Sequence, residues 1–233
     1  DEALQAGERK LAPFGSRKVL VRANFTDLGR VLKNLHIKNV DGVLLDLGVS
    51  SFQLDKAERG FSFSREAPLD MRIDKSLQIS AYDIVNNYDQ RDLEKIIRDF
   101  GEEKMAGRIA RAISQKRHLS PIRTTVELAS IINGAMPSKF RHQKIHPATR
   151  TFQAVRIAVN NELGIIRPAI NAAVNVLKPG GRICIIAFHS LEDRLVKNEF
   201  RSLEGGCTCS KDIPICICSR EAKLKVLTRK ALI

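Results

Sequence analysis

The sequence has no tryptophan and only two tyrosines among its 233 residues. Any aromatic side chain that stacks on a base or a cofactor ring is therefore expected to be one of its ten phenylalanines. No run of about eighteen apolar residues occurs, so no membrane-spanning helix is predicted. A secretory signal peptide is not visible at the start either.

Acidic residues are scarce relative to basic ones. Asp and Glu number 26 against 39 Lys and Arg, which gives a formal net charge of +13. Such an excess favours a polyanionic partner, with nucleic acid first and an anionic membrane surface second. The apolar fraction of 43% is ordinary for a globular protein, and the length allows one large domain or two small ones.

One stretch predicts a ligand site at the edge of a sheet. The apolar run Gly42–Leu45 ends on Asp46 and is followed by a turn of small residues at 48–51. In open α/β sheets, ligands bind where the strands end at their carboxyl edge. The alternative is a buried strand with a solvated Asp at its end.

The first part of the chain reads as strand, helix, strand. Lys18–Arg22 and Val40–Asp46 are predicted strands, and Leu28–Leu35 is a predicted helix that Thr26 or Asp27 can cap. This order is typical of a parallel βαβ unit. A helix is also predicted before it, over 1–14.

No strand signal occurs between residues 80 and 136, where four segments have helical periodicity. The α/β pattern then resumes with two helices, a turn, a strand and a helix capped by Ser190. Their predicted ranges are 80–85, 89–100, 102–115 and 124–135, then helices 147–163 and 166–177, turn 178–181 and strand 182–187.

Six strings, which are spread over residues 46–194, closely resemble the ribosomal RNA small subunit methyltransferase H family (MraW-like). They are DLGVSSFQLD at 46–55, ERGFSF at 58–63, PLDMR at 68–72, GEE at 101–103, HPATRTFQAVRI at 146–157 and FHSLEDR at 188–194.

The resemblance implies transfer of a methyl group from S-adenosylmethionine to N4 of a cytidine in small-subunit ribosomal RNA. It also implies an α/β fold, namely a class I (Rossmann-like) methyltransferase domain with an inserted all-α domain. Residues 1–76 and 146–233 are expected to form the methyltransferase domain, and 77–145 the helical insertion that holds RNA. The small ribosomal subunit is the expected partner, a homodimer is possible, and the expected compartment is the cytoplasm.

The resemblance assigns three residues to the cofactor: Phe25 on the adenine, Asp46 beside the adenosine and methionine portion, and Gln53 as a polar contact. The family's Gly-Gly-His loop, its ribose-binding acid and its basic C-terminal tail are not found in this sequence. The chain therefore looks like a fragment that lacks the first strand of its sheet. This polypeptide is expected to bind S-adenosylmethionine weakly or not at all.

The chemistry needs a group that accepts a hydrogen bond from the N4 amine and takes its proton. Asp46, with the Ser50 and Ser51 turn, is the candidate by analogy with other amino-methyltransferases. Candidate substrate contacts are Phe61, Phe63, Arg72 and His189. Both phenylalanines can instead be core residues, and His189 can cap a helix.

Five cysteines complete the candidate residues. Cys184, in an apolar strand, is predicted to be an inert core thiol. Four thiols, at Cys207, Cys209, Cys216 and Cys218, could form a small zinc knuckle, although their C-x-C spacing is tighter than the usual one. The alternative is a hairpin with reduced thiols.

Two further functions remain compatible with the sequence. One is a basic RNA-binding protein without catalysis, and the other is a methyltransferase that acts on DNA or on another small acceptor.

Overall fold

The computed structural model describes residues 2–49, 57–141, 145–205, 221–228 and 230–231. The chain forms two compact units. The first unit comprises Asp1–Leu47 and Leu163–Ile233, and the second comprises Gly48–Glu162. Within the described ranges, no helix is long and apolar enough to cross a membrane. The predicted domain limits at 77 and 145 stay a prediction.

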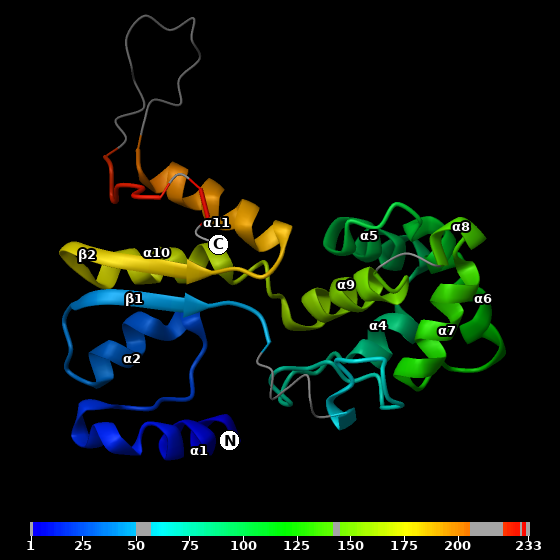
Figure 1. The fold of residues 1–233 in the computed structure, drawn as a ribbon, viewed down its shortest axis with the longest axis horizontal. Helices are drawn as coiled ribbons and strands as arrows, with labels where there is room; N and C mark the ends of the chain where they lie inside the picture. Colours follow the sequence, from blue (N-terminus) through cyan, green and yellow to red (C-terminus); the bar gives the residue numbers. More distant parts are fainter. Residues whose placement is uncertain (1, 50–56, 142–144, 206–220, 229, 232–233) are drawn as a thin grey trace, which may run out of the picture. The chain divides into compact units, whose positions relative to one another are not determined.

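The first unit contains a parallel pair of strands, β1 (Val40–Asp46) and β2 (Leu177–Ile186). They lie side by side in Figure 1 with their arrowheads in the same direction. Gly42 to Asp46 pair in register with Arg182 to Ile186. The carboxyl ends of both strands therefore meet at one edge of the sheet.

The predicted Lys-Pro-Gly-Gly turn lies inside β2 as a bulge. Val40 pairs with Leu177 and Gly42 with Arg182, so β2 carries extra residues between these two pairs. Gly180 has a φ of 79°, a left-handed conformation that favours glycine. The strand prediction for 182–187 is thus confirmed, and β2 additionally takes in the turn before it.

Alternation along the two strands separates a packed face from an exposed one. Leu45 of β1 and Ile185 of β2 pack against a cluster that includes Ile170 of α10 (Ile166–Val176) and Val196 of α11 (Ser190–Leu203). On the other face Leu44 is 64% exposed. Cys184 is also exposed, so its prediction as a core thiol is wrong. Its side chain lies on the exposed face of β2.

The N-terminal part of the first unit is helical and irregular. It contains α1 (Glu2–Lys10), the 3-10 helices η1 (Ala12–Arg17) and η2 (Phe25–Asp27), and α2 (Leu28–Asn34). The predicted strand at 18–22 is not observed, because β1 and β2 pair only with each other among the described residues and no ladder is available to it. The predicted βαβ unit is therefore wrong in this part of the chain.

The second unit is built mainly from helices, and the predicted helical segments are confirmed with shifted ends. They are α4 (Ala81–Asn87), α5 (Gln90–Gly101), α6 (Ala106–Leu119), α7 (Thr125–Ala135) and α9 (Ala148–Asn160), together with the short α8 (Ser138–Arg141) and the 3-10 helix η3 (Ala57–Arg59).

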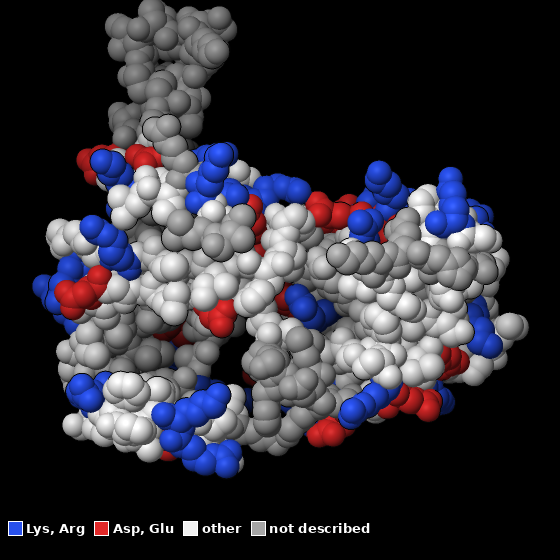
Figure 2. Space-filling model, in the orientation of Figure 1, with Lys and Arg blue, Asp and Glu red and all other residues white. Residues whose placement is uncertain are grey.

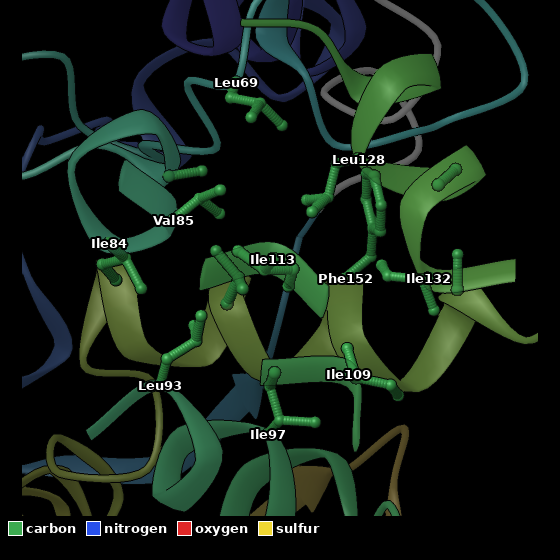
Figure 3. Packing of buried hydrophobic residues seen from close by; sticks show 14 of the residues in the cluster. Leu69, Ile84, Val85, Leu93, Ile97, Ile109, Ile113, Leu128, Ile132 and Phe152 are labelled. Atoms are coloured by element: carbon green, nitrogen blue, oxygen red, sulfur yellow. The ribbon is translucent and has the colours of Figure 1, made fainter. Parts of the chain in front are cut away.

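Apolar residues four positions apart explain why these helices pack together. Leu93 and Ile97 of α5, Ile109 and Ile113 of α6, and Leu128 and Ile132 of α7 are fully buried. Figure 3 shows them in one group with Phe152 of α9. Residues before residue 77 also join this core, since Phe61, Leu69 and Met71 belong to the same buried cluster.

Candidate functional site

Asp46 is the last residue of β1 and lies at the carboxyl edge of the strand pair. Its neighbours Leu45 and Leu47 are buried at 5% and 4% exposure, whereas Asp46 itself is exposed. The Leu47 amide donates to the Ile186 carbonyl at 3.1 Å, which extends the pairing one residue beyond the strand. Gly48 then turns the chain with a φ of 83°. A carboxylate is thereby presented at this edge of the sheet.

The same edge carries the start of α11. Asp46 is paired with Ile186, and Phe188, two residues further on, is 66% exposed. The His189 Nδ1 accepts a hydrogen bond from the Glu192 amide at 3.4 Å, and the Glu192 carboxylate accepts one from the Phe188 amide at 2.8 Å. His189, not Ser190, is therefore the residue whose side chain caps α11, because the helix begins one residue earlier than predicted.

Phe25 lies in η2, on the N-terminal side of α2. Asn24 fixes this turn, since its Oδ1 accepts a hydrogen bond from the Thr26 amide at 3.1 Å. Phe25 is 36% exposed, and η2 packs against α10. An exposed ring on a capped turn can stack on a flat heterocycle.

Several predicted site residues lie outside the described part of the chain. They are Ser50, Ser51, Gln53 and the four clustered cysteines, Cys207, Cys209, Cys216 and Cys218. Their cofactor, catalytic and zinc roles stay predictions.

In the second unit, Phe61 is 8% exposed and packs in the core, and the Arg59 guanidinium lies 5.9 Å from its ring centre. Phe63 is half-buried, 4.7 Å from the His146 ring and 4.8 Å from the Phe152 ring. Both phenylalanines thus contact the helical core. A core role was the alternative to base stacking that the sequence analysis left open.

Arg72 forms an ion pair with Asp70, at 2.5 Å from its Nε to the carboxylate. It also donates to the Leu77 carbonyl at 2.8 Å. The hydrogen bond and the charge of Asp70 raise the pKa of Arg72 above its usual value, while partial burial opposes that rise. Its guanidinium is therefore engaged in organising the loop that it belongs to.

Two side chains hold the backbone of this loop, and sequence reasoning missed both of them. The Asn160 carboxamide donates to the Met71 carbonyl and accepts from the Ile73 amide, each at 2.7 Å. Arg59 donates to the carbonyls of Arg72 and Ile73 at 2.8 and 3.0 Å. Met71 has a φ of 58°, a conformation that side chains other than glycine rarely adopt. Nothing in the residue pattern indicates such a conformation.

A cavity of about 360 Å³ lies between the N-terminal ends of α6 and α9 and the segment around α8. We call it the α6–α9 cavity. Its walls are largely apolar, and its polar lining comes from charged residues and one histidine. The residues that line it are Glu103, Lys104, Met105, Met136, Phe140, Ile145, His146, Pro147 and Arg150. Sequence reasoning did not predict this cavity.

Basic residues dominate part of the second unit. Residues 104–146 contain nine Lys and Arg (104, 108, 111, 116, 117, 123, 139, 141 and 144) and one acid, Glu127. Figure 2 shows Lys and Arg on the visible face of each unit, with Asp and Glu among them. Arg117 has an internal role, because it donates to the carbonyls of Val85 and Tyr88 at the end of α4. Arg108 and Arg111 are exposed on α6.

Comparison with known proteins identifies relatives along the whole chain. The family model described as the MraW methylase family matches residues 1–233. The chain is 60% identical over 231 residues to "Ribosomal RNA small subunit methyltransferase H" of Syntrophus aciditrophicus, covering 99% of this chain and 73% of that protein. It is 50% identical to the protein of the same name from Carboxydothermus hydrogenoformans, covering 100% of this chain and 75% of that protein. For the Clostridioides difficile protein of that name the identity is 49%, with coverages of 99% and 74%.

Proposed function

Because the chain belongs to the MraW methylase family, we propose that it takes part in methylating N4 of a cytidine in small-subunit ribosomal RNA, with S-adenosylmethionine as methyl donor. The observation that carries the proposal is the family match over residues 1–233. The names of the relatives support ribosomal RNA as the substrate. The class I methyltransferase fold that the family implies agrees with the mixed α/β structure.

The three residues that the family resemblance assigns to the cofactor suit it chemically. In this proposal Phe25 packs on the adenine ring, and Asp46 lies beside the adenosine and methionine portion. Gln53 supplies a further polar contact. A pocket for such a molecule needs an apolar or aromatic wall and a few polar groups that fix its orientation. When bound, S-adenosylmethionine supplies an electrophilic methyl group on a sulfonium ion.

The chemical task of the protein is to make a weak nucleophile react. The N4 lone pair of cytosine is delocalised into the ring, so the amine attacks poorly unless it is aligned and deprotonated. We propose that the Asp46 carboxylate accepts a hydrogen bond from the amine, with the Ser50 and Ser51 turn beside it, and so aligns N4. As the N–C bond forms, the bond between the methyl carbon and the sulfonium sulfur would break and leave a neutral thioether. N4 loses one proton, which Asp46 accepts directly or through a water.

Helices α4 to α8 of the second unit are proposed to hold the RNA, as the inserted all-α domain of residues 77–145. The nine-to-one excess of basic over acidic residues at 104–146 supports contact with the phosphate backbone. Phe63, Arg72 and His189 remain proposed substrate contacts. Phe61 is proposed to act from the core, because it is buried.

The test is transfer of a labelled methyl group from S-adenosylmethionine to small-subunit ribosomal RNA, first as naked RNA and then as assembled subunits. Asp46→Asn is expected to lower turnover by about a hundredfold or more, the range usual for a lost general base. Asp41→Asn is the matched control, because Asp41 lies in the same strand and pairs with Lys178 at 2.8 Å. Undiminished turnover of Asp46→Asn would rule out Asp46 as the acceptor.

A basic RNA-binding protein without catalysis is the alternative, and the same basic stretch favours it. Tight RNA binding with no methyl transfer to either form of the substrate, by a chain that calorimetry shows to bind S-adenosylmethionine, would support this alternative. Methyl transfer to DNA but not to RNA would support the hypothesis that the protein is a DNA methyltransferase.

A further inference from the structure

We propose that the α6–α9 cavity binds a single guanine nucleotide of an unpaired RNA segment, with Glu103 reading the base and Lys104 and Arg150 holding the phosphate. The inference rests on the proposed function, since it takes RNA to be the partner. It adds a base-specific contact in the second unit that is separate from the cytidine that is methylated.

The size and walls of the cavity suit a flat, partly apolar ligand. Its volume of about 360 Å³ falls in the usual range for small-molecule sites. Met136 is 6% exposed and Phe140 packs at the edge of the core, so this wall is preformed. Unpaired RNA bases are commonly held against aromatic side chains, and the polarisable sulfur of methionine also packs well on rings.

Glu103 is a charged side chain at the cavity that is more than nine-tenths buried. Its side chain is 7% exposed, and Oε1 accepts a hydrogen bond from the Met105 amide at 2.8 Å. Oε2 lies 3.9 Å from the Arg150 guanidinium, too far for a hydrogen bond. A carboxylate has about four acceptor sites, so within the described part of the chain most of them are not used by protein donors.

The acceptor-only character of this carboxylate selects among the bases. The Watson–Crick edge of guanine presents two adjacent donors, N1–H and the N2 amine, which match the two oxygens of a carboxylate. Adenine and cytosine each present one donor beside an acceptor nitrogen, and uracil presents one donor between two carbonyls. Guanine is therefore the base that satisfies Glu103 best, because the other three place an acceptor against a buried negative charge.

The charge around the cavity suits the phosphate of the same nucleotide. Lys104 is exposed and lies next to Glu103, and the Arg150 side chain is 50% exposed. In the part of the chain that the structure describes, no carboxylate pairs with Lys104. Two cations near an apolar cavity favour a ligand with an aromatic body and an anionic group.

Methionine labelling gives a direct test, because the chain has three methionines. Met105 and Met136 line the cavity, whereas Met71 is fully buried and does not line it. With 13C-methyl methionine, guanosine 5′-monophosphate is expected to shift the Met105 and Met136 signals and to leave that of Met71 unchanged. Cytidine 5′-monophosphate is expected to bind about tenfold more weakly, the discrimination of one bidentate base contact.

Glu103→Gln is expected to abolish the preference for guanosine 5′-monophosphate over cytidine 5′-monophosphate. The carboxamide replaces one hydrogen-bond acceptor by a donor, while it retains an oxygen for the Met105 amide. Glu66→Gln, at an exposed position of the same unit, is the matched control. Lys104→Ala is expected to weaken the binding of guanosine 5′-monophosphate and to leave the binding of guanosine itself unchanged.

Three results would overturn the proposal: equal shifts with ribose 5-phosphate, equal affinity for the two nucleotides, or no shift at all. The readout needs no methyl donor, so it is independent of the proposed function. Methyl transfer to RNA without a nucleotide response at Met105 and Met136 would refute the cavity proposal alone. A guanine-specific response without methyl transfer, in a chain that calorimetry shows to bind S-adenosylmethionine, would leave the cavity proposal standing and refute the activity.

Discussion

Asn160 donates a hydrogen bond to the carbonyl of Met71, at 2.7 Å, across 89 positions of the sequence. Its Oδ1 accepts from the Ile73 amide at the same distance, so one carboxamide from α9 satisfies two backbone groups of the loop. Helix α9 thereby fixes the strained Met71 conformation. This loop carries Arg72, which is a proposed substrate contact. In the proposed function, the conformation of the loop therefore positions a group that binds the substrate.

We expect Asn160→Ala to lower the free energy of unfolding of the second unit by about 2 kcal/mol, because two partly buried backbone groups lose their partner. Tyrosine fluorescence in a urea titration measures this unit alone, since the chain has no tryptophan and its two tyrosines, Tyr82 and Tyr88, lie in it. Asn87→Ala, at an exposed position, is the control. Equal midpoints for the two variants would contradict the role of Asn160.

A second prediction concerns the crossing of α5 and α9. A Cβ at Gly101 would lie 2.7 Å from the Arg150 carbonyl oxygen and 3.3 Å from the Ala154 Cβ. Gly101→Ala is therefore expected to separate the helices and to cost about 2 kcal/mol. Gly134→Ala, where a Cβ meets nothing within 4 Å, is expected to be neutral or to stabilise the unit by up to about 1 kcal/mol. The same tyrosine titration compares them, and a Gly101→Ala variant as stable as the parent would show that the crossing can relax.

The capping box of α4 gives a dependence on pH. Ser80 hydrogen-bonds the Asp83 carboxylate through its amide at 2.8 Å and its hydroxyl at 2.6 Å, and these bonds lower the pKa of Asp83. A lowered pKa in the folded state contributes stability that is fully present above the unfolded value of about 3.9 and is lost as pH falls through the folded pKa.

Asp83→Asn is therefore expected to destabilise the second unit at neutral pH by about 1 kcal/mol. The difference from the parent is expected to shrink when the titration is repeated below about pH 4. Asp89→Asn is the control, since Asp89 precedes α5 without a side-chain cap. A difference between Asp83→Asn and the parent that is independent of pH would contradict this account.

The cap of α11 can be tested by hydrogen exchange. His189→Ala removes the acceptor for the Glu192 amide, and exchange at the start of α11 is expected to accelerate about fivefold. Ser190→Ala is expected to have a smaller effect, because the cap is the side chain of His189. A larger acceleration of exchange in Ser190→Ala than in His189→Ala would instead identify Ser190 as the cap, as the sequence predicted.

Local patterns predicted the helices of the second unit well, because pairs such as Ile109 and Ile113 recur at helical spacing and are buried. The strand predicted at 18–22 failed for a different reason. A strand exists only with a neighbour, and sequence alternation does not show whether one is available. The bulge in β2 could not be predicted from the sequence either, because pairing with β1 decides where β2 begins.

The position of Asp46 at the end of its strand was predicted, because a single segment determines it. The α6–α9 cavity was missed, because several elements contribute to it: its lining comes from residues 103–105, 136, 140, 145–147 and 150. The capping role of His189 was foreseen only as an option, because histidine and serine both offer an acceptor at a helix start. Cys184 shows the same limit, since an apolar neighbourhood in sequence does not fix which face of a strand is covered.

The pairing of β1 with β2 also bears on the order of folding. β1 ends at Asp46 and its partner begins at Leu177, so the strand pair cannot close until the intervening chain is present. The second unit is one continuous segment, Gly48–Glu162, with many contacts between neighbouring helices. Short-range contacts form faster than pairing across a long loop. The helices are therefore expected to fold first during synthesis, and β1 to remain without its partner strand until β2 has been made.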